Sequence, residues 1–189
     1  MNERVYLRAP QSGDWKEWAE LRRVSRSFLT PWEPTWSQDN LSKPSFRDKL
    51  RVYRMDWRHD VSYSFYAFSR SNDQMLGGIT LGNVRRGAAH MGTIGYWMGE
   101  VHAGQGYMTE ILSSVIDYAF DELALHRLEA ACLNHNEASK AVLEKVGFRV
   151  EGHARGYLKI DGKWQDHTTF SLLQNDPRLS RKGWLEGKL

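Results

Sequence analysis

The segment spanning residues 134 to 148 constrains the fold more strongly than any other part of this 189-residue chain. Four of its residues recur on one side of a helix: Ala138, Ala141, Val142 and Lys145. Asn136 is suited to cap the start of this helix by accepting a backbone N–H bond, and Gly147 is suited to end it in the left-handed conformation. Phe148 then returns to the core. The pattern predicts a short, capped helix that leads directly into a strand.

A second informative stretch covers residues 92 to 110 and predicts a strand, a loop and a helix. Residues 93 to 98 favour a strand, and Gly104 and Gly106 allow the chain to turn closely. Residues at helical spacing follow the glycines: Tyr107, Ile111, Val115 and Tyr118. The backbone N–H groups of residues 104 to 107 are therefore expected to point out of a helix N-terminus. Such an end attracts a pyrophosphate through unpaired donors and the helix dipole.

Together these two stretches favour acetyl-CoA chemistry. The sequence Gly-Gln-Gly at 104 to 106 also suits an ordinary tight turn, so this motif alone leaves both interpretations open. Its place roughly one βα unit before the helix at Asn136 favours the pyrophosphate. Asn136 and Ser139 offer side-chain hydrogen bonds there, against which a pantetheine arm can dock.

These motifs resemble the GNAT family of N-acetyltransferases, and within it the ribosomal-protein acetyltransferases of the Rim type that act on an N-terminal alanine. The likeness covers almost the whole chain. Three further segments carry it: Phe-Leu-Thr-Pro-Trp-Glu-Pro (28 to 34), Gly-Asn-Val-Arg-Arg-Gly (82 to 87) and Ala-Arg-Gly-Tyr-Leu-Lys-Ile-Asp-Gly-Lys-Trp-Gln-Asp-His (154 to 167). The family often has Gln or Arg where this chain has Val101, so the likeness at the glycine loop depends on its backbone.

The resemblance implies an α/β (α+β) fold, the GNAT fold, with a mixed and mostly antiparallel central sheet that is flanked by helices. This sheet is expected to splay between its fourth and fifth strands. Residues 1 to 173 are expected to form the acetyltransferase domain, and residues 174 to 189 a loosely held polar C-terminal tail.

Residue patterns place the individual elements. They predict strands at 5 to 8, 63 to 68, 75 to 83, 93 to 98, 128 to 133, 148 to 158 and 164 to 173. They also predict helices that begin at a cap by Asp14, at residues 45 to 58, after Gly106 and at Asn136. A polar, turn-rich stretch is expected between the first two helices, and Asp161-Gly162 is expected to form the last hairpin.

The resemblance also implies which residues hold the acyl donor. The expected cofactor-binding residues are Tyr96, Trp97, Met98, Gly104, Gln105, Gly106, Tyr107, Met108, Asn136 and Ser139. Because a splayed strand leaves backbone N–H groups unpaired, those along residues 96 to 98 are expected to stabilise the oxyanion of the transfer step. No metal and no covalent enzyme intermediate are required, and the seven histidines show no metal-ligand spacing.

Three side chains are candidates for proton transfer. Ser139 matches the family position near the CoA sulfur and is expected to protonate the departing thiolate, but a capping interaction with Asn136 is equally favoured. Tyr157 is a second candidate acid, or else a strand tyrosine packed beneath the site. Glu33, held between two prolines, is the candidate base because aromatic neighbours can desolvate its carboxylate. The alternative for Glu33 is an exposed turn residue.

One departure from the family bears on the base. Related Rim-type enzymes carry an acidic residue immediately before the tyrosine that matches Tyr157, where this chain has Gly156. Either another group acts as the base, or little base strength is needed. An α-ammonium has an ordinary pKa of about 7.7–8.0, against about 10.4 for lysine, so the neutral amine is easier to reach at a protein N-terminus. This difference favours N-terminal over lysine acetylation.

Composition is ordinary for a globular domain, with 41% hydrophobic and 26% charged residues. The net charge of +3 and the pI near 9.0 mildly favour anionic partners, and the basic residues are too dispersed for a polybasic arm. No apolar run approaches the roughly 20 residues of a membrane span, and no signal peptide is recognisable. Cys132 is the single cysteine and is expected to be a buried strand thiol, so the chain is expected to be cytoplasmic.

The sequence therefore predicts an acetyl-CoA-dependent N-acetyltransferase that modifies the N-terminal α-amine of a protein, with alanine of a small-subunit ribosomal protein as the expected acceptor. Two alternatives remain open: a GNAT enzyme that acetylates a small amine such as a polyamine or antibiotic, and a non-catalytic CoA- or ribosome-binding module. The expected partners are acetyl-CoA and a ribosomal protein, with no membrane, and with nucleic acid only through a ribosomal context.

Overall fold

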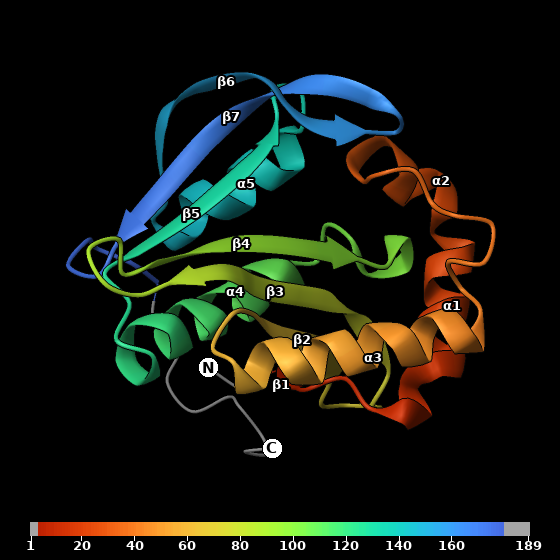
Figure 1. Cartoon of the computed structure of the whole chain (residues 1–189). Coiled ribbons are helices and arrows are strands. Elements are labelled where there is room, and N and C mark those ends of the chain that lie inside the picture. The colour runs from red at the N-terminus through yellow and green to blue at the C-terminus, as the bar shows by residue number, and fades with distance from the viewer. Residues whose placement is uncertain (1–3, 180–189) are drawn as a thin grey trace.

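A seven-stranded sheet forms the centre of the computed structural model, which describes residues 4–179 (Figure 1). Its strand order is β1-β2-β3-β4-β5-β7-β6, with β4 and β5 parallel and the other neighbouring strands antiparallel. The strands are β1 (Val5–Arg8), β2 (Tyr63–Ser69), β3 (Met75–Arg85), β4 (Met91–Met98), β5 (Arg127–Leu133), β6 (Arg149–Ile160) and β7 (Lys163–Leu173).

The helices flank both faces of this sheet. The α-helices are α1 (Trp15–Val24), α2 (Arg26–Leu29), α3 (Lys43–Arg58), α4 (Tyr107–Asp117) and α5 (Glu137–Val146). Short turns of 3-10 or π helix are η1 (Ser12–Asp14), η2 (Thr30–Trp32), η3 (Glu100–His102) and η4 (Tyr118–Glu122). Figure 1 shows α3 in front of the sheet and α4 and α5 behind it.

The larger core lies between the sheet and the α4 and α5 face. Every residue of α4 from 108 to 117 is buried, which suits a helix that is apolar on most sides. Two of its serines satisfy their hydroxyl groups within the helix: Ser113 donates to the carbonyl of Thr109 at 2.9 Å, and Ser114 to that of Glu110 at 3.0 Å. Burial of these polar side chains therefore leaves no hydroxyl unsatisfied.

The helix α5 begins and ends as the sequence predicts. The side chain of Asn136 accepts the backbone N–H of Ser139 at 3.0 Å, and Gly147 adopts the left-handed conformation with a φ of +111°. Phe148 follows and is 3% exposed. These features confirm the predicted cap, the predicted stop and the return of the chain to the core.

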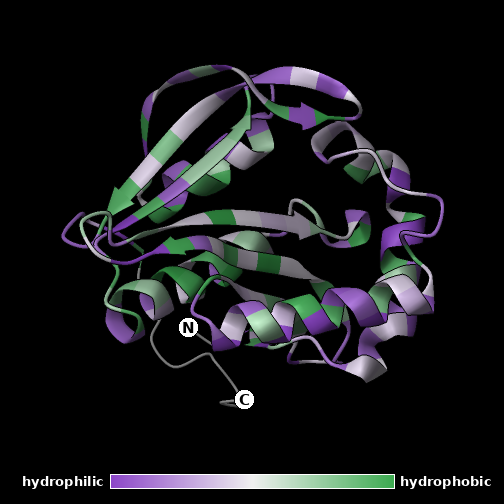
Figure 2. Cartoon of the chain, in the orientation of Figure 1, coloured by the Kyte–Doolittle hydropathy of each residue, from purple (hydrophilic) through white to green (hydrophobic). Residues whose placement is uncertain are grey.

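A second, smaller core lies on the opposite face, under α1 and α3. Trp18 of α1 and Phe46 of α3 pack with their ring centroids 4.9 Å apart, and Tyr66 and Phe68 of β2 lie beneath them. Figure 2 shows hydrophobic and hydrophilic residues interleaved along α3, as expected for a helix that buries one side only.

The sheet splits between β4 and β5. These two strands pair only over residues 91 to 94 of β4 and 127 to 130 of β5. Beyond Ile94 and Ala130 they diverge, while β4 continues to pair with β3 and β5 continues to pair with β7. Figure 1 shows the opening widen toward the carboxyl end of β4. The predicted splay between the fourth and fifth strands is thus confirmed, and so are the mixed, mostly antiparallel sheet and the flanking helices.

All seven predicted strands are present, with ends that differ by up to two residues from the predictions. The hairpin between β6 and β7 turns at Asp161 and Gly162, both with positive φ, as predicted. The expected turn-rich stretch after α1 was partly wrong, because residues 26 to 32 form α2 and η2. The helix predicted to begin at Ser45 begins at Lys43, since Ser42 accepts the N–H of Ser45 and caps it.

The predicted role of Asp14 as a side-chain cap of α1 is also wrong. Asp14 has helical backbone angles and makes no side-chain cap bond. Its carboxylate instead accepts two bonds from Arg8, at 2.9 and 2.6 Å, and the backbone N–H of Gln11 at 2.7 Å. The buried carboxylate therefore ties the end of β1 to η1.

Part of the segment assigned to the C-terminal tail packs onto the domain. Arg178 lies over the ring of Phe120 at 4.9 Å and donates to Asp121 and to the carbonyl of Gln174. The backbone N–H of Leu179 reaches the carbonyl of Val146 at 3.4 Å. The ordered chain thus continues beyond residue 173, and residues 180 to 189 of the predicted tail lie outside the described residues. Within residues 4–179, no helix is both long and apolar enough to cross a bilayer.

Candidate functional site

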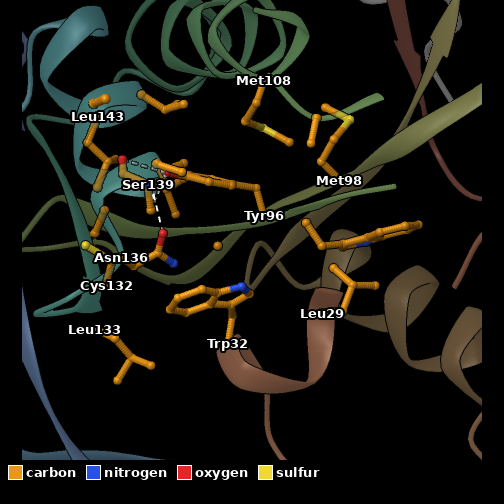
Figure 3. A pocket seen from close by; sticks show the side chains of 18 of the residues that line it. Leu29, Trp32, Tyr96, Met98, Met108, Cys132, Leu133, Asn136, Ser139 and Leu143 are labelled. Atoms are coloured by element: carbon orange, nitrogen blue, oxygen red, sulfur yellow. Dashed lines mark hydrogen bonds between the residues drawn. The ribbon is translucent and has the colours of Figure 1, made fainter. Parts of the chain in front are cut away.

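A cavity of about 550 Å³ occupies the opening between β4 and β5. Its volume is in the range of small-molecule and cofactor sites. Its walls come from β4, the start of α4, β5, α5, the α2 and η2 region, and the β6 and β7 hairpin. Figure 3 shows Trp32 and Leu29 on one side of the cavity and Met108 on the other, with Tyr96 between them. Segments distant in sequence therefore meet around a single cavity.

The glycine loop forms one end of this cavity. Gly104 and Gly106 have φ angles of +73° and +80°, and Gly106 precedes the first turn of α4. The first N–H groups of any α-helix lack partners within the helix, so this turn presents donors and a positive dipole end. Tyr107 and Met108 also line the cavity. The structure thus places the predicted anion-binding loop at the opening.

Arg4 braces this loop from outside. Its Nε donates to the buried carboxylate of Glu110 at 2.6 Å, and its Nη2 donates to the carbonyl of Gln105 at 3.2 Å. Its guanidinium also lies over the ring of Tyr107 at 4.6 Å. Gln105 is exposed, and its side chain donates to the carbonyl of Val101 at 3.0 Å. Of the predicted loop residues, Gln105 alone does not line the cavity; it contributes backbone to the loop.

Strand β4 provides backbone donors along the opening. The N–H of Gly99 donates to Leu76 of β3 at 2.9 Å. Because successive N–H groups of a strand point to opposite sides, those of Tyr96 and Met98 face away from β3 and toward the opening. The N–H of Trp97 faces β3, and Trp97 also lines the cavity. The three predicted residues are therefore brought to the site.

Ser139 and Tyr96 meet across the cavity. Their hydroxyl oxygens are 2.7 Å apart, and the Tyr96 hydroxyl also lies 3.3 Å from the carbonyl of Ser139 (Figure 3). Burial raises the pKa of the Tyr96 phenol well above its ordinary value, so Tyr96 remains protonated and can donate. The cap of α5 uses the backbone N–H of Ser139, so the Ser139 hydroxyl does not serve as a cap.

Cys132 of β5 lies in the same wall as Ser139. It is 6% exposed, and burial raises the pKa of its thiol, which disfavours the thiolate. The predicted buried strand cysteine is confirmed. Among residues 4–179, no three His, Cys, Asp or Glu side chains gather to form a metal-binding group.

Glu33 lines the cavity directly after η2, and its carboxylate is held by two partners. Arg22 donates to it at 3.2 and 2.5 Å, and the indole N–H of Trp36 donates at 2.8 Å. The guanidinium of Arg22 in turn lies over the rings of Trp36 and Trp97, at 4.5 and 4.9 Å. The aromatic surroundings expected for Glu33 are present, and they include a buried cation that the sequence motif did not reveal.

The backbone of Glu33 joins the segment after η2 to the hairpin between β6 and β7. Its carbonyl accepts the N–H of Asp161, at the tip of the β6 and β7 hairpin, at 3.0 Å. Nearby, the rings of Trp32 and His135 lie 5.4 Å apart. The N-terminal segment after α2 therefore contacts both the hairpin and the loop before α5, on the side of the cavity away from the sheet.

Tyr157 lies outside the cavity. It is 46% exposed, whereas Leu158 and Ile160 of the same strand line the cavity. Its ring meets that of His167 in an edge-on contact, with centroids 5.6 Å apart. His167 is 2% exposed and lines the cavity, with its Nδ1 2.9 Å from the carbonyl of Gln165.

Sequence reasoning missed three side chains that shape the site: Arg4, Arg22 and His167. A charged residue four positions after Trp18, on the apolar side of α1, was an available signal for Arg22. His167 is one of seven histidines and belongs to no recognisable motif, and Arg4 contacts the loop only through the folded chain.

Comparison with known proteins agrees with this geometry. The acetyltransferase (GNAT) domain family matches residues 4–149. The "Probable N-acetyltransferase YjcK" of Bacillus subtilis (strain 168) is 36% identical over 172 residues, covering 91% of this chain and 95% of the relative. The ribosomal protein uS5-alanine N-acetyltransferase of Escherichia coli (strain K12) is 30% identical over 174 residues, covering 92% and 90%.

A solved structure shows the same likeness. Mycobacterium smegmatis RimJ in complex with CoA-disulfide superposes with a TM-score of 0.85 at 33% identity, covering 89% of this chain and 81% of that protein. The predicted resemblance is thereby confirmed. With a sheet split between β4 and β5 and a family match over most of its length, the chain belongs to the GNAT family of acetyltransferases.

Proposed function

We propose that this enzyme transfers the acetyl group of acetyl-CoA to the N-terminal α-amine of a protein, with alanine of a small-subunit ribosomal protein as the acceptor. The observation that carries the proposal is the single cavity that joins the start of α4, the split between β4 and β5, and the Trp32 and Glu33 region. The uS5-alanine N-acetyltransferase of E. coli and the CoA complex of M. smegmatis RimJ support the choice of acceptor and donor.

The donor is assigned to the α4 and α5 side of the cavity. The pyrophosphate is held by N–H groups at the start of α4, where Gly104 and Gly106 keep side chains out of the way. The pantetheine arm follows the unpaired edge of β4, with Asn136 on the facing side. Lys145 of α5 also lines the cavity and supplies a positive charge near the phosphates.

The transfer step uses backbone and hydroxyl donors. The amine nitrogen attacks the thioester carbonyl carbon, and the N–H groups of Tyr96 and Met98 stabilise the oxyanion. The C–S bond then breaks, the departing thiolate takes the proton of Ser139, and the Ser139 oxygen regains a proton from the acetylated nitrogen, which must lose one as the amide forms. Either hydroxyl of the Tyr96 and Ser139 pair can donate; in the arrangement that we assign, Tyr96 donates to the Ser139 oxygen, which leaves the Ser139 proton to point toward the sulfur.

Glu33 is assigned to the acceptor amine. Its carboxylate lines the cavity, and Arg22 and Trp36 fix its position. It accepts the proton that the α-ammonium must lose. That ammonium has an ordinary pKa of about 7.7–8.0, so little base strength is required. Tyr157 contacts the cavity only through His167, and we assign it a supporting role behind that ring.

Replacement of Gly106 by valine tests the donor site. A β-branched residue is strained at a φ of +80°, so the loop is expected to shift and its N–H donors to lose their alignment. Affinity for CoA, measured by titration calorimetry, should fall about tenfold or more. Gly87→Val is the matched control, because Gly87 also has a positive φ of +65° but lies outside the cavity. Equal CoA affinity in the two variants would remove the loop from the site.

A double-mutant cycle tests the pair of Ser139 and Tyr96. Ser139→Ala should lower kcat about a hundredfold, as loss of a general acid does. Tyr96→Phe should lower kcat about tenfold, with the KM for acetyl-CoA unchanged, because the Ser139 hydroxyl loses its orientation. Adding Tyr96→Phe to Ser139→Ala should cost nothing further. Independent, additive losses would show that Tyr96 does not act through Ser139.

Glu33→Gln tests the base. Turnover should fall about a hundredfold. The loss should be greatest below the ordinary pKa of an α-ammonium, about 7.7–8.0, where most acceptor is protonated. CoA affinity should not change. Trp36→Phe serves as the control, because it removes one contact to Glu33 but keeps the carboxylate. A wild-type pH–rate profile in Glu33→Gln would exclude Glu33 as the base.

Competition among acceptors tests the proposed function itself. Peptides with a free N-terminal alanine should react faster than N-blocked peptides with an internal lysine, and faster than spermidine, because the α-amine is easier to deprotonate. Leucine-initiated peptides should react more slowly than alanine-initiated ones, since each rejected methylene changes selectivity roughly ten- to two-hundredfold. Preference for spermidine or lysine would overturn the N-terminal assignment. Absence of turnover with every acceptor would indicate a non-catalytic CoA-binding module.

A further inference from the structure

The outer side of α3 carries a line of arginines. Arg47, Arg51, Arg54 and Arg58 follow one another at intervals of four, three and four residues, which places them on one side of the helix. All four are exposed. At a rise of about 1.5 Å per residue, the line extends over roughly 16 Å. The basic residues are dispersed in the sequence, and the helix brings these four into one row.

Most of these arginines lack an ion-pair partner. Arg51 lies 3.4 Å from Asp48, but both side chains are more than 70% exposed, so the pair is weak. Within residues 4–179, Arg47, Arg54 and Arg58 form no ion pair. Other arginines of the chain are engaged by carboxylates: Arg8, Arg22, Arg86, Arg127 and Arg178. The α3 arginines are therefore available to an external anion.

The net positive charge of the protein is concentrated on α3. Six basic and two acidic residues give α3 a formal charge of +4, which exceeds the +3 of the whole chain. The remaining residues together carry a formal charge of −1. Charge is thus concentrated on a single surface helix, as expected for an electrostatic contact with a polyanion.

We propose that the row of Arg47, Arg51, Arg54 and Arg58 binds the phosphate backbone of RNA. Guanidinium groups match phosphate geometry with paired N–H donors, and four of them along 16 Å can contact successive phosphates. An anionic membrane fits less well, because α3 buries Phe46 and Leu50 in the core and its exposed apolar residues are limited to Val52 and Met55. An enzyme whose acceptor lies in an RNA-rich particle gains encounter rate from such a contact.

The row lies apart from the chemistry. No residue of α3 lines the cavity. RNA binding and acetylation of a free peptide can therefore be measured separately, and failure of one does not imply failure of the other.

Binding to a dye-labelled RNA hairpin, measured by fluorescence anisotropy over a series of KCl concentrations, tests the proposal. The triple variant Arg47→Gln, Arg54→Gln, Arg58→Gln removes the three unpaired charges and keeps good helix formers. Its affinity at low salt should fall about ten- to a hundredfold, and the slope of log affinity against log salt should decrease by roughly 2 to 3. Acetylation of a free alanine peptide should be unchanged.

A second triple variant is the control, matched in the number of charges removed. Arg23→Gln, Arg149→Gln, Arg155→Gln removes three exposed arginines that lie outside α3, of which Arg23 and Arg149 pair with Glu20 and Asp176. Its RNA affinity should stay within about twofold of wild type at equal salt. Melting temperatures of both variants verify that the fold is retained. The proposal is overturned if the wild-type protein does not bind the hairpin at low salt, or if the two triple variants lose equal affinity. Binding through α3 to anionic phospholipid vesicles but not to RNA would also overturn it.

Discussion

The site depends on the incomplete pairing of β4 with β5. Strands β4 and β5 hydrogen-bond only as far as Ile94 and Ala130, and after that each keeps its partner on the outer side alone. Unpaired backbone N–H groups are costly when they are buried without a partner, and here the cavity gives them access to a ligand. The same divergence makes room for the cavity and leaves α4 and α5 to close it from one face. The donor site and the oxyanion donors that we propose thus share the same break in the sheet.

On the side of the cavity that we assign to the acceptor, the buried guanidinium of Arg22 contacts Glu33 and the surrounding tryptophans. Arg22 is 8% exposed and sits among Trp18, Trp36 and Trp97, with Glu33 as its carboxylate partner. A buried charge without its partner typically costs several kcal/mol, so the positions of Arg22 and Glu33 are mutually dependent. The indole rings cover the guanidinium of Arg22, and Trp97 also lines the cavity. The carboxylate of Glu33 is therefore held by Arg22 and Trp36 in the absence of an acceptor.

The sequence predicted those features that are local. The cap at Asn136, the left-handed Gly147, the glycine loop and the β6 and β7 hairpin all depend on residues a few positions apart, and the structure has each of them. The position of Tyr157 outside the cavity could not be read from alternation, because the register of β6 against β7 shifts between Ala154 and Leu158. The side of a strand that faces a cavity is fixed by tertiary packing, and the sequence pattern alone did not settle it.

Features that depend on distant contacts could not be read in advance. Arg4 meets Glu110 of α4 across 106 residues, and Arg22 of α1 meets Glu33 because the chain turns back through α2 and η2. Asp14 looked like a helix cap, yet Arg8 competes successfully for its carboxylate. The segment at 26 to 32 mixes polar residues and a proline with three large apolar residues, and the packing of Leu29 in the core supports its short helical turns. In each case a contact made in the folded chain outweighed the local preference.

The hydrogen bond between the Asp161 N–H and the Glu33 carbonyl closes one wall of the cavity. It joins the segment after α2 to the tip of the β6 and β7 hairpin, two parts of the chain that are far apart in sequence. An internal loop has chain continuing in both directions and needs more room at this wall than a chain terminus, which brings in one strand only. The bond between Asp161 and Glu33 is therefore consistent with the N-terminal acceptor that we propose, and such a terminus is modified while it still extends freely from the protein that carries it.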